Sequence, residues 1–427
     1  MGEGIKRPVI SKDILPFTQV DIPLIQARKS NSQAAVLSAL ISFDMLRKCY
    51  VCVTKKHFTF KRLMKRDTLQ FWLQIVGLVL ILYVFLVSIG LLGGSFKLFG
   101  KELAIQIIEM TSNPLVGIFA GILGTTLAQS SSTTTAIAVG MVAGGALTIE
   151  GAIPVIMGAN VGTSVTNTLV SMGHITRKEE FKRALAGATV HDFFNLIAVL
   201  ILLPLEIATG YLQYVAERTA DLFQGIGGMK FANPLKQLTS PAVNWLIELL
   251  GSNPVLCLIV ALIIMYLALK FLVDLARGVV IKRAERYLHR YLFGAAPVAM
   301  LFGIVLTIMV QSSSITTSMI VPLIGAGILT LEQVFPFTLG ANIGTTVTAM
   351  LASLATGNVA AVTVAFAHLF FNITGIAIVY PIAQIRQIPL KMARGLAELT
   401  SRSRVYAFIY VGCVFYIIPL LLILVWR

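Results

Sequence analysis

The sequence predicts an all-α polytopic membrane protein that contains two copies of one unit, and three observations support this. The chain has 427 residues, of which 57% are hydrophobic and 12% charged, and its mean hydropathy is +0.85. Soluble domains are about 45–50% apolar and about 25% charged, so this apolar excess fits a bilayer better than water. Apolar stretches of about 20 residues, long enough to span a membrane, recur along the chain. A polar motif, QSSS, occurs twice between them.

The pattern of spans and charged segments divides the chain into six regions. These are a basic cytosolic N-terminal region (1–69), the first span with the first QSSS repeat (70–207), an extracellular connecting loop and scaffold (208–253), a scaffold span with a cytosolic basic segment (254–294), the second QSSS repeat (295–383), and a cytosolic basic loop with the last span (384–427). The basic clusters lie beside spans, which fits the positive-inside rule and lipid headgroups. We therefore expect a lipid bilayer as partner and no nucleic acid.

The two copies of the repeated unit align over a long stretch. Gln129 pairs with Gln311 at an offset of 182 (311 − 129), and the offset holds without a gap to Ser171. About half of the paired residues are identical. Further along, HDFFN from His191 matches HLFFN from His368. This self-similarity predicts two copies of one structural unit.

Loop charges predict that the two copies are inverted in the membrane. His174–Arg183 carries four Lys or Arg residues, whereas the equivalent Leu354–Ala360 carries none. In the next pair of loops the bias reverses, since 386–404 is basic and 208–250 is nearly neutral. Equivalent loops then face opposite sides of the membrane. Inverted repeats with broken helices are typical of secondary transporters, and we expect about eight spans plus two re-entrant hairpins.

Each QSSS motif follows an apolar run, and its side chains suit an oxyanion. Such hydrogen-bonding groups would cost several kcal/mol each if they faced lipid, so they must face protein or an aqueous cavity. Ser and Gln offer several neutral donors, and a broken helix adds free backbone N–H groups. The residues expected to bind the oxyanion are Gln129, Ser130, Ser131, Ser132, Gln311, Ser312, Ser313 and Ser314.

The segments GANVGTSVT and GANIGTTVT, together with one intramembrane acid, predict sodium sites. Their glycines allow the backbone to unwind and present carbonyls to a small cation. Asp192 lies within an apolar stretch, where burying a carboxylate costs free energy. The equivalent residue of the second copy is Leu369, which indicates one extra cation site in the first copy. The residues expected to bind sodium are Asn160, Thr163, Thr166, Asp192, Asn342, Thr345 and Thr348. Two alternatives stay open: small residues that only pack helices, and an Asp192 paired with a nearby Lys or Arg.

Other functional classes fit less well. No His, Lys or Asp lies close to either QSSS to act as a base, so we expect neither an enzyme nor a cofactor, and sodium as the only metal. An anion channel stays open as an alternative, and saturable, sodium-dependent flux would separate a transporter from it. A transporter of another oxyanion, such as sulfate, also stays open.

These motifs resemble the type II sodium-dependent phosphate cotransporters over roughly residues 70–425. The paired QSSS motifs, the two GAN segments, and RALAGATVHDFFN followed by LLPLEIATGYL carry the resemblance. It implies symport of sodium and inorganic phosphate across the plasma membrane (the inner membrane in a bacterium). It also implies a transport domain beside a scaffold domain, elevator-like alternating access and a homodimer.

The resemblance also implies residue roles. It places phosphate and neighbouring sodium on the two QSSS motifs, sodium on Thr345 and Thr348, and net inward positive charge movement at Asp192. The chain departs from relatives at His174 and Arg177, where they carry Gln and Asp, and it carries Ala in place of Ser before Asn342. It also lacks the long disulfide-bearing outer loop of vertebrate members, which indicates a bacterial-type or shortened member.

Overall fold

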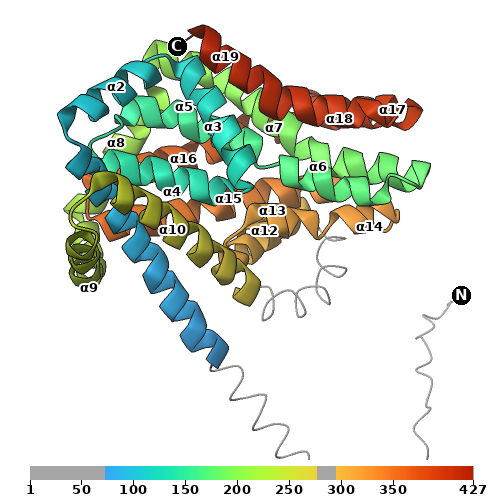
Figure 1. The fold of residues 1–427 in the computed structure, drawn as a ribbon. Coiled ribbons are helices and arrows are strands. Elements are labelled where there is room, and N and C mark those ends of the chain that lie inside the picture. The colour runs from blue at the N-terminus through green and yellow to red at the C-terminus, as the bar shows by residue number, and fades with distance from the viewer. Residues whose placement is uncertain (1–72, 277–294, 427) are drawn as a thin grey trace, which may run out of the picture. The chain divides into compact units, whose positions relative to one another are not determined.

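The computed structural model describes residues 73–276 and 295–426, which belong to one structural unit, Phe71–Arg427. The expected N-terminal region 1–69 and the basic part of 254–294 lie outside these residues. Every regular element in the two described ranges is a helix (Figure 1). Six of these helices are long and apolar enough to cross a membrane. This confirms the predicted all-α polytopic membrane class.

The first half contains eight helical elements, in chain order the helix Leu73–Phe99, α2 (Lys101–Thr111), α3 (Pro114–Ala128), α4 (Ser131–Gly144), α5 (Ile149–Gly162), α6 (Val165–Ser171), the 3₁₀ turn η1 (Met172–His174) and α7 (Lys178–Thr209). Three helices connect the halves: α8 (Tyr211–Gly225), α9 (Gly228–Leu249) and α10 (Pro254–Ala276). The second half contains α12 (Ala296–Val310), α13 (Ser313–Ser318), α14 (Val321–Gly325), α15 (Leu331–Thr356) and α16 (Val359–Val379), followed by α17 (Ala383–Arg402), α18 (Val405–Gly412), the π-helical η3 (Cys413–Ile417) and α19 (Ile418–Trp426).

The number of spans depends on how the broken helices are counted. A seventh crossing results if α2 and α3, which are bent by 101° relative to each other, form one span. The sequence predicted about eight spans, and the described residues contain six or seven. In the second copy, α12 and the α13–α14 pair are apolar but too short to count, because the chain breaks at Gln311 and Ser312. The opposite orientation of the two copies in the membrane stays a prediction.

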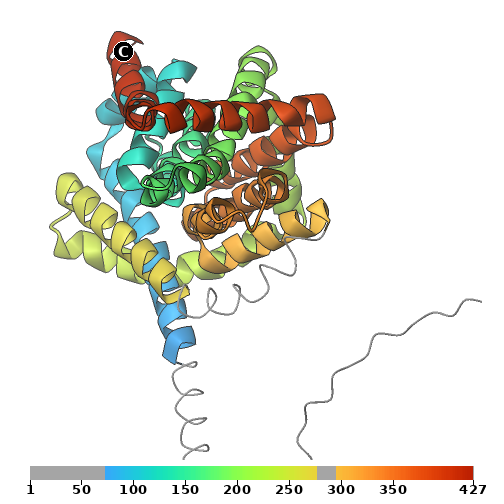
Figure 2. The ribbon, with the colours of Figure 1, turned by 90° about the vertical axis from the view of Figure 1, so that its right-hand side faces the viewer.

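Two segments described as loops in the sequence analysis are helical in the structure. The expected connecting loop 208–253 forms α8 and α9, and the expected basic loop at the start of 384–427 forms α17. These helices are amphipathic, so charged residues cover one face and lower the average hydropathy that reveals a span. The last three helices run along one side of the unit (Figures 1 and 2).

Glycine contacts join the two main helix pairs, α3 with α5 and α12 with α15. A Cβ atom added at Gly158 would lie 1.9 Å from the carbonyl oxygen of Ile118, and one at Gly340 would lie 2.0 Å from that of Met300. No side chain fits at such distances, so only glycine allows these backbones to approach. The two glycines occupy equivalent positions in the repeat (340 − 158 = 182).

This packing corrects one prediction. The second GAN segment was expected to unwind, but α15 continues without a break from Leu331 to Thr356. In the first copy, the helix is interrupted only between Gly162, the end of α5, and Val165, the start of α6. The glycines of these segments serve close helix packing, as small residues do in membrane proteins.

Candidate substrate and ion site

The two QSSS motifs form matching turns between helices. Gln129 and Gln311 end α3 and α12 in the left-handed conformation, with φ of 52° and 58°, which non-glycine residues rarely adopt. The next residue begins the following helix as its N-cap. The Ser130 hydroxyl accepts from the Thr133 N–H, and the Ser312 hydroxyl accepts from the Ile315 N–H. The predicted helix breaks are therefore present in both copies.

Both turns line one cavity of about 270 Å³. Six of the eight residues predicted to bind an oxyanion line it: Gln129, Ser130, Ser132, Gln311, Ser312 and Ser314. The other two, Ser131 and Ser313, are buried and do not line it. The fold thus brings together two motifs that are 182 residues apart (311 − 129) in the sequence.

A threonine from the second motif of each copy positions each glutamine. Thr166 donates to Oε1 of Gln129 at 3.1 Å, and Thr348 donates to Oε1 of Gln311 at 2.8 Å. The glutamine amides donate to the backbone of the preceding turn. Both ends of each glutamine are thus fixed, and the turn is held in one conformation.

Two further hydrogen bonds link the copies beside the cavity. The Ser314 hydroxyl donates to the carbonyl of Thr163 at 3.4 Å. The Thr317 hydroxyl donates to Oδ1 of Asn167 at 3.0 Å. Each bond joins the QSSS helix of the second copy to the GAN segment of the first, so the site depends on both copies.

A buried network of amides and histidines crosses between the copies. Asn160, in the first copy, contacts His368 at 3.1 Å and donates to Asn372 at 3.2 Å, both in the second copy. In the converse arrangement, Asn342 contacts His191 and donates to Asn195 at 2.8 Å. The predicted sodium ligands Asn160 and Asn342 are thus engaged by protein groups, and the HDFFN and HLFFN motifs supply their partners.

The remaining predicted sodium ligands fall into two groups. Thr163 and Thr345 are buried and donate to the carbonyls of Ala159 and Ala341 in the preceding turn, so their oxygens can still accept or ligate. Thr166 and Thr348 hold the glutamines, and Thr166 lines the cavity. The structure places Thr166 and Thr348 at the QSSS turns, whereas Thr163 and Thr345 lie inside the helix pairs.

Asp192 is buried in the middle of α7 with an unusual partner. Its side chain is 3% exposed, and Oδ2 accepts from the Tyr410 hydroxyl at 2.8 Å. Within the described residues, Oδ1 has no hydrogen-bond partner, and no ion pair joins Asp192 to a Lys or Arg. The alternative of an acid paired with a base is therefore not supported within 73–276 and 295–426.

Tyr410 lies in α18, shortly before a local irregularity of the last span. The π-helical η3 follows directly after α18. Pro419 lacks the N–H that would bond the carbonyl of Phe415, so the regular ladder cannot continue through this turn. Single π turns often occur at functional sites, and this one follows the tyrosine that holds Asp192.

Sequence reasoning missed two features of the site. Lys270 and Asp274, one turn apart on α10, line the cavity with the QSSS turns. The signal was a Lys inside an apolar span, which is costly unless it faces water or a binding site. The second feature is a pair of buried hydroxyls, Thr125 and Thr307, that have no partner within the described residues. They occupy equivalent positions (307 − 125 = 182), just before each QSSS.

The two residues that depart from the resembled family lie in one small cluster. His174 contacts Glu180 at 3.2 Å, and Arg177 donates to the same carboxylate at 3.0 Å. Neither lines the QSSS cavity. In this structure they form a charged cluster at the start of α7.

Comparison with known proteins adds to this geometry. Residues 84–233 and 264–392 match the Na+/Pi-cotransporter family. Curated relatives include sodium-dependent phosphate transport protein 2B of Homo sapiens, 35% identical over 460 residues, covering 83% of this chain and 66% of the relative. Protein 2A of Ovis aries is 35% identical over 423 residues, covering 79% of this chain and 65% of the relative.

The chain is shorter than these relatives. It spans slightly less than two thirds of their length, 64% in the case of protein 2B of Pongo abelii. No solved structure matches it.

Proposed function

Because this chain belongs to the Na+/Pi-cotransporter family, we propose that it couples sodium entry to symport of inorganic phosphate. The observation that carries the proposal is the single cavity lined by both QSSS turns. Relatives named sodium-dependent phosphate transport proteins, at about 35% identity, support the same substrate and coupling ion.

Phosphate is proposed to bind between the two QSSS turns. Ser132 offers a hydroxyl donor, and the first backbone N–H groups of α4 follow directly after the turn at Gln129. The Ser314 hydroxyl lines the cavity but already donates to the carbonyl of Thr163. These donors are neutral, and Lys270 adds the one positively charged side chain of the described lining, which the carboxylate of Asp274 partly offsets. Ser131 and Ser313 shape the turns from within the protein.

Sodium is proposed to bind oxygens beside the phosphate. Asp192 has an unpartnered carboxylate oxygen, and Thr163 and Thr345 have hydroxyl oxygens free to accept. Asn160 and Asn342 position these helices through their crossed network, and their oxygens lie one turn from the threonines. Because the second copy has Leu369 in place of Asp192, we expect one carboxylate site and inward movement of net positive charge.

The wider arrangement follows from the family and the charge pattern. We propose a multi-pass protein of the plasma membrane with a cytosolic N-terminus, assembled as a homodimer. The two repeats form a transport domain that moves in an elevator-like manner against a scaffold containing the helix Leu73–Phe99 and α10. No cofactor or catalytic residue is needed, because substrate and ions cross unchanged.

Two other functions make different predictions. A transporter of another oxyanion would use the same neutral donors, and competition by sulfate and by arsenate, a phosphate mimic, separates it from a phosphate transporter. An anion channel would conduct without sodium and without saturation. The hydrogen bonds that link the two copies beside the cavity favour a binding site between the copies over a continuous pore.

The test is uptake of radiolabelled phosphate into proteoliposomes under an inward sodium gradient or an equal potassium gradient. We expect saturable accumulation above equilibrium with sodium only, inhibited by arsenate and little affected by sulfate. Equal uptake under both gradients would contradict sodium coupling. Uptake of sulfate in place of phosphate would contradict the substrate.

A further inference from the structure

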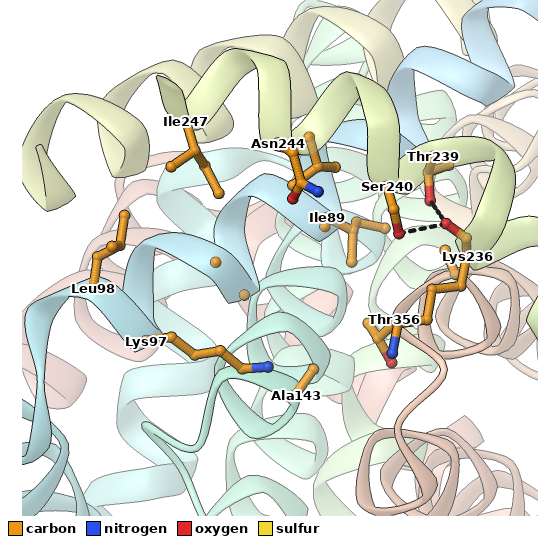
Figure 3. Close-up of a pocket in the computed structure, with 15 residues that line it drawn as sticks. Ile89, Lys97, Leu98, Ala143, Lys236, Thr239, Ser240, Asn244, Ile247 and Thr356 are labelled. Carbon is orange, nitrogen blue, oxygen red and sulfur yellow. Dashed lines mark hydrogen bonds between the residues drawn. The ribbon is translucent and has the colours of Figure 1, made fainter. Parts of the chain in front are cut away.

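A second cavity lies away from the QSSS turns. It has a volume of about 400 Å³ and opens between the helix Leu73–Phe99, α9 and the C-terminal turns of α4 and α15 (Figure 3). Its polar lining includes Lys97, Lys236, Ser240, Asn244 and Thr356. No residue lines both this cavity and the QSSS cavity. We call it the two-lysine pocket.

Two lysines enter this pocket from separate helices. Figure 3 shows that the Lys97 amine ends beside Ala143, and the Lys236 amine ends beside Thr356. The Lys236 side chain lies over Gly357, where an added Cβ would be 2.8 Å from its Cδ. Neither lysine forms an ion pair with a carboxylate of the described residues. The pocket therefore contains two positive charges without a protein counter-charge in that part of the chain.

The other polar groups show which donors remain free. The Ser240 hydroxyl donates to the carbonyl of Lys236 at 2.6 Å, and the Thr356 hydroxyl donates to that of Ser353 at 2.7 Å. These hydroxyls can only accept. The side-chain donors without a hydrogen bond to described residues are the two amines and the Asn244 amide, so the pocket presents free donors suited to an anion.

Capping of helix ends does not account for both lysines. At the end of α4, the carbonyls of Met141 and Val142 accept from the Ala146 and Gly145 N–H groups, and that of Ala143 accepts from Asn358. These carbonyls are satisfied without Lys97. A helix C-terminus carries roughly −0.5 charge, so the ends of α4 and α15 together offset about one of the two positive charges. About one positive charge remains.

The ligand that fits this chemistry is a compact oxyanion, since lysine amines bind phosphate groups as point charges. Ile89, Val243 and Ile247 form an apolar wall, which also allows an attached hydrocarbon portion. We propose that the two-lysine pocket binds a phosphate group between the amines of Lys97 and Lys236. The group belongs either to free inorganic phosphate or to an anionic phospholipid.

The pocket also has a defined relation to the proposed transport path. Ser132 at the start of α4 lines the QSSS cavity, and Ala143 near its end lines the two-lysine pocket. Eleven residues (143 − 132) at 1.5 Å each separate them by about 16 Å along one helix. With the N-terminus cytosolic, as the charges predict, the pocket faces the outer side, from which symported phosphate arrives.

The test measures acetylation of individual lysines by mass spectrometry in the full-length protein in nanodiscs. Three conditions are compared at equal ionic strength: phosphatidylcholine alone, phosphatidylcholine with inorganic phosphate, and phosphatidylcholine with phosphatidylglycerol. We expect Lys97 and Lys236 to react severalfold more slowly in the second or third condition. Lys101 on α2 is exposed and does not line the pocket, so it serves as the internal control.

The outcomes distinguish the sources and can overturn the proposal. Protection by inorganic phosphate identifies the free anion, and protection only by phosphatidylglycerol identifies the lipid. No protection under either condition, or equal protection of Lys101, would overturn it. Lys236→Gln should abolish protection of Lys97, whereas Lys101→Gln should not. Protection should persist in Gln129→Ala/Gln311→Ala protein, which separates this pocket from the proposed transport site.

Discussion

The two copies of the repeated unit place the same groups around the cavity. Gln129 and Gln311 share the left-handed conformation, each followed by a serine N-cap. Thr166 and Thr348 hold them in the same way. The two copies thus have the same backbone conformation and the same hydrogen bonds where they form the proposed site.

Away from the cavity, the copies differ for identifiable reasons. Gly140 lies in the continuous α4, where an added Cβ would be 2.7 Å from the Leu92 side chain. Its equivalent is Pro322, near the start of α14. Proline removes a backbone donor and disturbs the preceding turn, so the helix is broken between α13 and α14. The first copy packs closely on the helix Leu73–Phe99, whereas the second has a shorter, broken helix. The comparison indicates that the two copies share the glycine packing of the main helix pairs and the geometry of the QSSS turns, and differ where the first copy packs on the helix Leu73–Phe99.

The largest expected effect tests the shared packing. Gly158→Ala and Gly340→Ala each place a methyl group about 2 Å from a carbonyl oxygen, so the helices must separate. We expect each change to destabilise the protein by about 1–3 kcal/mol or more. Thermal unfolding in detergent measures this. Gly173→Ala, where no atom lies within 4 Å, is the matched control. A normal melting temperature for only one of the two variants would show that the copies pack differently.

The second test concerns the difference in charge between the two copies, which carry Asp192 and Leu369 at equivalent positions. Asp192→Leu makes the first copy like the second, which carries Leu369. We expect uptake to lose its dependence on membrane potential, since one fewer cation binds per cycle. Uptake is measured at imposed potassium diffusion potentials. Tyr410→Phe, which removes the donor to Asp192, should weaken sodium affinity but keep the voltage dependence. Unchanged voltage dependence in Asp192→Leu would remove Asp192 from the sodium site.

The third test addresses the threonines that hold the glutamines. Thr166→Val and Thr348→Val each remove one hydrogen bond of about 0.5–1.5 kcal/mol, so phosphate affinity should fall about 2- to 12-fold in each. Saturation curves of sodium-driven uptake report this change. Thr219→Val on α8, away from the cavity, is the control. A large effect in one copy and none in the other would mean that only one QSSS turn contacts phosphate.

The sequence allowed much of this arrangement to be predicted. The QSSS and GAN motifs were recognisable because polar groups at bilayer depth need a protein or water partner. The continuity of α15 was not predictable, because glycine in a GAN segment can either unwind a helix or permit close packing, and only the neighbour at Met300 decides. The place of Lys270 in the cavity and the crossed network at Asn160 and Asn342 depend on which helices pack together. No local sequence pattern contains that information.

The smallest effect concerns an ion pair between α17 and α7, formed by Glu398 and Lys182. The hydrogen bond from Lys182 lowers the pKa of Glu398 below its usual range. The pair therefore stabilises the fold above the ordinary pKa of Glu, and the contribution disappears as pH falls through the lowered value. Both groups are partly exposed, so the effect should be small. Glu398→Gln should melt slightly earlier than wild type at neutral pH and equally in acid. A difference that persisted in acid would exclude this pair as its cause.

The central claim, that the two QSSS turns form one phosphate site, is tested most directly by equilibrium binding of radiolabelled phosphate in sodium. Lys97→Gln/Lys236→Gln protein is used, so that only the QSSS cavity is counted. We predict one phosphate per chain. Gln129→Ala and Gln311→Ala should each weaken the affinity of that single site severalfold, while the exposed-site change Gln224→Ala should not. Two phosphates per chain, with each glutamine variant losing one and leaving the other unchanged, would contradict the account.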